Sequence, residues 1–185
     1  MKKNLCTLLI CCTTTIAHAE TNPFFNGYDN QVTINLGTGV NGGFLIPPPS
    51  QFVPYAMLQI QYSQPTSFFR VPARKTINTT MNIGYGKKYG WRWDDFTIPI
   101  ALLSEDIALF YNDNWYTFIG LGIGMQLQQN ERIGSKLIFG FKIGAGYHLS
   151  ECTALELFAQ HYSNGNTAPE NNSYAFFGAG LSYNF

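Results

Sequence analysis

Hydrophobic and polar residues alternate with a period of two along most of the chain after about position 30. A period of two is typical of β-strands, because successive side chains point to opposite faces. No apolar run beyond residue 19 approaches the length of a membrane-spanning helix. The alternation separates into eight stretches, which cover residues 31–40, 55–64, 76–87, 96–103, 115–127, 136–149, 155–165 and 173–185.

On most of these stretches one face is apolar and the other is small or polar. In the fifth stretch, for example, Ile119 and Leu121 alternate with Gly120 and Gly122. A soluble sandwich must fill a core with its inner face, so it seldom places glycines in a row there. A small barrel has a narrow interior that suits small inward residues. The pattern therefore predicts an all-β fold, an eight-stranded antiparallel transmembrane β-barrel with its apolar face toward lipid.

The pattern also makes finer predictions. In the fourth stretch we expect Phe96, Ile98, Ile100 and Leu102 on the outward face. Glu105 and Asp106 are expected to be solvated residues at a strand end. Pro65 and Pro72 suggest a connection between the second and third stretches. The Gly- and Pro-rich segment from Asn41 to Pro54 is expected to be a long loop, and the sequence does not indicate its role. Lys142 and Glu156 are expected to point inward, as parts of a polar interior network.

The N-terminus reads as a secretory signal peptide over residues 1–19, which leaves residues 20–185 as the barrel. Lys2 and Lys3 precede an apolar run, and Ala17-His18-Ala19 has the form of a cleavage site. At the other end, the alternation finishes on an aromatic residue, Phe185, which resembles the C-terminal insertion signal of bacterial outer-membrane barrels. We therefore expect an integral protein of the bacterial outer membrane.

An even number of strands places both ends of the chain on one side, which in an outer-membrane barrel is the periplasm. The seventh strand then ends at the outer rim, with His161 and Ser163 on its lipid-facing side. A hydroxyl beside an imidazole is the minimum apparatus for nucleophilic catalysis. The alternative is a harmless polar pair in the interfacial zone, where such groups cost little.

The segment from Glu131 to Phe185 resembles the lipid A 3-O-deacylase (PagL-type) family. The resemblance is carried by a loop motif, a Gly-alternating strand and a second motif at the end of the seventh strand; the motifs are Arg132-Ile133-Gly134-Ser135 and His161-Tyr162-Ser163-Asn164-Gly165. It implies an outer-membrane esterase that removes the 3-O-linked acyl chain of lipid A without a cofactor. It further implies His161 as the catalytic base, Ser163 as the nucleophile and Asn171 in the oxyanion hole. Ester hydrolysis needs donors for the developing oxyanion, and we expect them from Asn171 or from loop amides near Gly165.

One position departs from the family. The acid that orients the catalytic histidine falls on Ala175, which would lie opposite His161 if the last hairpin pairs Ser163 with Ser173. Three interpretations stay open: Glu170 supplies the acid, a Ser–His dyad suffices, or the activity is weak or lost. The last leads to an alternative function, a non-enzymatic barrel with a structural or adhesion role.

The partner implied by the resemblance is lipid A, or lipopolysaccharide, in the outer leaflet. The balance of 11 basic and 11 acidic residues leaves no basic stripe for nucleic acid. We expect no metal site, because the two histidines beyond the signal peptide, His148 and His161, lie at opposite ends of the barrel. Whether the protein forms a homodimer is not determined by the sequence.

Overall fold

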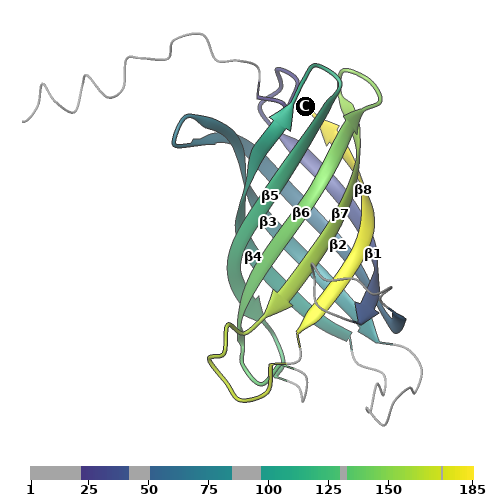
Figure 1. The fold of residues 1–185 in the computed structure, drawn as a ribbon, viewed down its shortest axis with the longest axis vertical. Helices are drawn as coiled ribbons and strands as arrows, with labels where there is room; N and C mark the ends of the chain where they lie inside the picture. The colour runs from purple at the N-terminus through teal and green to yellow at the C-terminus, as the bar shows by residue number, and fades with distance from the viewer. Residues whose placement is uncertain (1–21, 42–50, 85–96, 130–132, 172) are drawn as a thin grey trace, which may run out of the picture.

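The computed structural model describes residues 22–41, 51–84, 97–129, 133–171 and 173–185, and it confirms the barrel (Figure 1). Each strand pairs antiparallel with the next, and β8 pairs with β1 to close the sheet. No helix in the described ranges is long and apolar enough to cross a membrane. The signal peptide predicted for residues 1–19 lies outside the described residues. The strands are β1 (Gln31–Asn41), β2 (Gln51–Phe68), β3 (Val71–Gly84), β4 (Thr97–Tyr111), β5 (Trp115–Gln126), β6 (Leu137–His148), β7 (Thr153–Ser163) and β8 (Tyr174–Asn184).

The alternation in the sequence becomes an inside and an outside. On β1, Ile34 and Leu36 are 53% and 62% exposed on the outer face, whereas Thr33 and Asn35 are fully buried in the lumen. Inside, the Asn35 amide donates to Gln59 Oε1 of β2 across 2.8 Å. An apolar exterior and a hydrogen-bonded polar interior are what a membrane barrel requires, because lipid offers no hydrogen-bond partners.

The two ends of the barrel differ in their connections. The C-terminus and the short turns between β4 and β5 and between β6 and β7 lie at the upper end in Figure 1. Longer connections, such as the one from β7 to β8, lie at the lower end. In outer-membrane barrels short turns face the periplasm and long loops face the exterior. The upper end is therefore the periplasmic end, and β7 runs toward the exterior as expected.

Large inward side chains fill the space that inward glycines leave. A Cβ on Gly146 would lie 2.6 Å from the Tyr116 hydroxyl oxygen, and one on Gly144 would lie 2.6 Å from Cζ of Phe118. Both rings are fully buried. The glycine rows in the sequence thus mark places where an aromatic ring from a neighbouring strand crosses the lumen.

The predicted outward face of β4 was wrong. Ile98, Ile100 and Leu102 are at most 4% exposed and point into the barrel. Leu102 occupies the space beside two glycines of β5 and β6, since a Cβ on Gly122 or Gly140 would meet its Cδ2 at 2.5 or 2.6 Å. Both faces of β4 are apolar near its outer end, so the alternation alone could not show which face points into the lumen. The pairing with β3 sets it, because Ile100 lies opposite the inward Thr80.

The connection expected around Pro65 and Pro72 is instead part of one long β2–β3 hairpin. Pro65 pairs with Arg74, and Pro72 pairs with Ser67. Pairing of β2 with β1 ends at Ser63, so Pro65 occupies a strand edge that has no neighbour needing its missing N–H. At the outer end, β2 begins at Gln51, inside the predicted loop from Asn41 to Pro54; residues 42–50 of that loop lie outside the described residues.

A charged cluster fills the lumen toward its periplasmic end. The fully buried Arg74 donates from Nε to Asp106 Oδ2 across 2.9 Å and from both terminal nitrogens to Glu156, across 2.5 and 3.0 Å. Lys142 Nζ lies 3.9 Å from Glu156 Oε2. The expected inward network of Lys142 and Glu156 is therefore confirmed. The expectation that Asp106 is solvated was wrong: it is 1% exposed because it faces Arg74 across the β3–β4 pair.

The segment before β1 closes the periplasmic end of the barrel. Phe24 and Phe25 are at most 1% exposed, and the Phe24 ring lies 4.5 Å from the Arg74 guanidinium carbon, in a cation–π contact. Its carbonyl accepts a hydrogen bond from Gln31 Nε2 at 2.8 Å. His148 Nε2 lies 2.8 Å from the Pro23 carbonyl oxygen, so His148 lies at the end of the barrel opposite His161, as expected. The sequence pattern gave no signal of this plug.

Candidate active site at the outer rim

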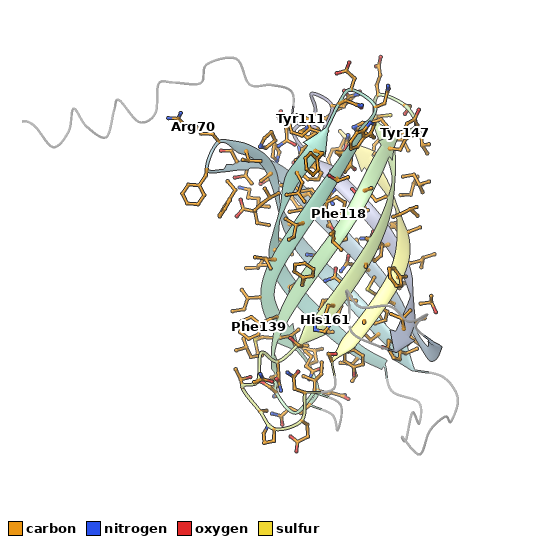
Figure 2. All side chains as sticks on the ribbon, viewed as in Figure 1. Arg70, Tyr111, Phe118, Phe139, Tyr147 and His161 are labelled. Carbon is orange, nitrogen blue, oxygen red and sulfur yellow. The ribbon has the colours of Figure 1, made fainter. Side chains whose placement is uncertain are left out.

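His161 and Ser163 end β7 at the rim opposite the termini. Figure 2 shows His161, together with Phe139, toward the end of the barrel that carries the long loops. The two residues share the face of β7 that also carries the exposed Leu155 and Leu157, whereas Tyr162 between them is fully buried in the lumen. Two residues along a strand span roughly 6.6 Å, so their side chains stand side by side on the lipid-facing wall.

Apolar side chains surround this pair. On β6, Phe141 pairs with His161 and Phe139 pairs with Ser163. On β8, Ala175 pairs with His161, as the sequence predicted, and Ala175 is only 5% exposed. The position from which a neighbouring strand could offer a carboxylate to the imidazole therefore holds a methyl group. The surface fits a hydrocarbon chain better than a polar substrate.

The loop after β7 is organised by Asn164, which is fully buried. Its amide nitrogen Nδ2 donates to the carbonyls of Glu170 and Ala168 across 2.9 and 3.3 Å, and its Oδ1 accepts from the Asn166 N–H at 2.8 Å. Asn side chains commonly capture nearby backbone in this way. Sequence reasoning gave Asn164 no role, although an Asn-Gly pair directly after the serine was a signal for a tight turn.

Gly165 is required by its backbone and by its neighbour. Its φ of +61° is a conformation that glycine adopts at little cost. A Cβ at this position would also meet the Phe139 ring at 2.8 Å. The chain therefore turns tightly past Ser163 while packed against the ring opposite it. This geometry brings the backbone of the predicted oxyanion-hole residue close to the serine.

Asn171 returns to the same loop from the far side. Its Oδ1 accepts from the Asn164 N–H at 3.0 Å, and its Nδ2 donates to Asn166 Oδ1 at 2.9 Å. An amide nitrogen carries two hydrogens, and this contact uses one of them. The structure thus places Asn171 and Gly165 in one hydrogen-bonded loop beside Ser163.

Glu170 lies against the loop that precedes β6. Its carbonyl accepts from the Gly134 N–H at 2.9 Å, and its carboxylate oxygen Oε2 fills the space that a side chain on Gly134 would need. The following residue, Asn171, forms a bridge with Ile133. The predicted loop motif before β6 therefore packs against the loop after β7. It is Ala175, not Glu170, that holds the paired position opposite His161.

Within the described ranges, no group of three His, Cys, Asp or Glu side chains is arranged to hold a metal ion. The candidate site consists of a hydroxyl, an imidazole and a loop of amides, on an apolar wall.

Comparisons with known proteins place this barrel in a family. It superposes on the outer membrane enzyme PagL with a TM-score of 0.54 and 17% identity, covering 84% of this chain and 99% of that one. It superposes on Neisserial surface protein A (NspA) with a TM-score of 0.58 and 12% identity, covering 84% and 96%. At these identities the likeness shows the fold alone. A search among curated proteins found no match. Neither the fold nor the comparisons support a homodimer.

The location of the protein follows from the same findings. Its similar structures are outer-membrane barrels, and its own apolar exterior requires a lipid surround. The protein is therefore an integral barrel of the bacterial outer membrane.

The sequence profile of one family, described as lipid A 3-O-deacylase (PagL), matches residues 55–184, which include most of β2, all of β3 to β8 and the whole candidate site. This chain belongs to the lipid A 3-O-deacylase (PagL) family.

Proposed function

We propose that this protein is an outer-membrane esterase that hydrolyses the 3-O-linked acyl chain of lipid A. The observation that carries the proposal is the outward position of His161 and Ser163 at the outer end of β7. This polar pair lies on the face of β7 that points away from the lumen, at the leaflet in which lipid A resides. The family match over residues 55–184 supports the same reaction.

In the proposed reaction Ser163 Oγ attacks the ester carbonyl carbon while His161 accepts the hydroxyl proton. Amides of the loop at Gly165 and Asn171 donate to the resulting oxyanion. The intermediate collapses, the carbon–oxygen bond to lipid A breaks, and His161 returns the proton to the departing 3-hydroxyl. Water then attacks the acyl-serine, again with His161 as base, and releases the fatty acid. No cofactor is needed for either step.

The substrate reaches the site sideways from the outer leaflet. Phe139 and Phe141 on β6 line one side of the pair, and the exposed Phe177 continues the apolar surface on β8. An acyl chain lying along this wall stays in a hydrocarbon environment while its ester meets Ser163. This arrangement positions the reacting atoms without a closed pocket.

The test is mass spectrometry of lipid A from membranes that contain the protein or its Ser163→Ala variant. We expect loss of one hydroxyacyl chain with the native protein and none with the variant. Ser150→Ala is the control, since it removes an exposed hydroxyl from the turn between β6 and β7, at the opposite end of the barrel. Acyl loss that persists in a folded Ser163→Ala variant would refute the nucleophile.

One observation favours a second candidate, a barrel that kept the fold and lost the chemistry. Ala175 offers no carboxylate to His161, and without an orienting acid the imidazole is less well held and its cation less stabilised. Labelling with a serine-directed fluorophosphonate distinguishes the two. Reaction at Ser163 supports the esterase, whereas an inert Ser163 together with unchanged lipid A in a folded barrel supports the non-enzymatic role.

A further inference from the structure

The β2–β3 hairpin extends past its neighbours at the periplasmic end. The β1–β2 pairing ends at Ser63 and the β3–β4 pairing ends at Ala73, but β2 and β3 continue to pair with each other as far as Phe68 and Val71. The last residue pairs therefore have no strand on either side. Figure 1 shows this hairpin leaning away from the barrel wall instead of continuing along it. Its role is not accounted for by the candidate active site.

The turn at the tip is made from residues that do not suit it. Phe69 and Arg70 link the two strands, with φ values of 48° and 72°. A two-residue hairpin turn with positive φ at both positions strongly prefers Asn-Gly or Asp-Gly. A non-glycine residue held in this region is strained, because its Cβ crowds the backbone. The chain accepts this strain twice in succession, which points to a use for the two side chains.

The tip is apolar and cationic. Phe69 is 86% exposed and Phe68 is 42% exposed, and their rings meet edge to face with centroids 4.7 Å apart. Arg70 is exposed beside them. Neither β2 nor β3 contains an aspartate or a glutamate. A pair of exposed rings beside a guanidinium, on a hairpin whose two strands contain no acids, complements a surface that is both apolar and anionic.

The height of the tip identifies that surface. Tyr147, Trp115 and Tyr183 are 54%, 40% and 57% exposed near the periplasmic ends of β6, β5 and β8. Such aromatic residues form the girdle that marks the membrane–water interface of a barrel. Figure 2 shows Arg70 to one side of the barrel, at about the level of Tyr147 along the vertical axis. The hairpin therefore reaches sideways at the level of the lipid headgroups.

We propose that the tip formed by Phe68, Phe69 and Arg70 is an anchor in the inner, phospholipid leaflet of the outer membrane. The two rings enter the interfacial zone, and the guanidinium binds lipid phosphate with its forked donors. The anchor fixes the rotation and depth of the barrel at the periplasmic interface. It occupies the leaflet opposite the candidate active site.

The test attaches a nitroxide spin label to the variant Ser67→Cys. Ser67 is exposed next to the tip, and its replacement leaves all three anchor residues in place. The full chain, purified from outer membranes with Cys152→Ser, is reconstituted in vesicles of phosphatidylethanolamine and phosphatidylglycerol. A label at Asn114, in the β4–β5 turn at the same end, is the matched control. We expect the ratio of oxygen to aqueous nickel-chelate collision rates to be several-fold higher at Ser67 than at Asn114.

A second variant separates anchoring from folding. Phe69→Asn combined with Arg70→Gly installs the favoured turn, so the thermal midpoint is expected to stay the same or rise, while the protection of the Ser67 label falls. Equal nickel accessibility at Ser67 and Asn114 would overturn the proposal, as would protection that survives the double variant. Protection that disappears on dilution into excess lipid would assign the tip to a second copy of the chain, and would overturn it also.

Discussion

Polar residues in this barrel occur in two settings with opposite character. Inside, Arg74 forms ion pairs with Asp106 and Glu156. Its Nη1 also donates a hydrogen bond of 2.7 Å to the side-chain oxygen Oε1 of Gln31. Outside, His161 and Ser163 stand among Phe139, Phe141 and Ala175. Every charge of the interior cluster faces an opposite charge, whereas His161 has an apolar neighbour on each adjacent strand and Ser163 pairs with Phe139.

The contrast shows how to separate structure from function in a membrane barrel. A buried charge must be paired because the surrounding strands exclude water, so the interior cluster is explained by the fold itself. A hydroxyl and an imidazole on the wall are not needed to fill the lumen or to satisfy the sheet. Polarity in the lumen is therefore explained by packing, whereas polarity on the wall supports the chemistry that we propose. Three changes test this division, and the largest effect is expected in the lumen.

Arg74→Met should strongly destabilise the barrel. It leaves Asp106 and Glu156 buried with only Lys142, 3.9 Å from Glu156, as a nearby cation. Removing one partner of a buried ion pair costs about 3–5 kcal/mol. Urea unfolding in lipid vesicles measures the loss, and lipid A deacylation per folded molecule should stay unchanged. The outward neighbour Lys75, changed to Met, is the control and should have little effect; equal losses for both variants would contradict the assigned role of the cluster.

Asn164→Ala should lower activity with only a small change in stability. The loop loses three hydrogen bonds, to the Glu170 and Ala168 carbonyls and from the Asn166 N–H, so Gly165 and Asn171 are held less firmly. A misplaced catalytic loop costs roughly 10- to 100-fold in rate. Single-turnover deacylation kinetics measure the effect. Thr167→Val, which removes a single hydrogen bond to the Asn164 carbonyl, is the matched control, and an equal loss in both would show that Asn164 is not a positioning residue.

Ala175→Glu should raise activity, and the expected effect is the smallest of the three. A carboxylate opposite His161 would orient the ring and stabilise its cation, with a gain of about tenfold, well below the ~10⁴ that a tightly coupled acid contributes. Steady-state deacylation rates of Ala175→Glu and the uncharged Ala175→Gln measure it. A gain with both variants would point to packing, and no gain with Glu would show that the site already has a source of orientation.

The sequence predicted the positions of most candidate-site residues, because the period of a strand is visible in neighbouring residues alone. Alternation placed His161 and Ser163 together on one face, and the hairpin spacing placed Ala175 opposite His161; the structure agrees on both points. The sequence did not predict the role of Asn164, because its side chain bonds to carbonyls several residues away and these contacts depend on the path of the loop. The contact of Glu170 with Gly134 joins two loops that are far apart in sequence, so no local pattern reveals it.

For the fold, the sequence alone determined the strand number, the barrel class and the outward face of most strands, because the lipid forces a period-two apolar pattern onto each strand. Only the tertiary structure decided the phase of β4, the partners of Arg74 and Asp106, and the plug at Phe24. Each of these depends on what lies across the lumen or at its mouth. Alternation along a strand shows which side chains share a face. Whether that face has space for Leu102, or a positive charge to pair with Asp106, depends on the neighbouring strands.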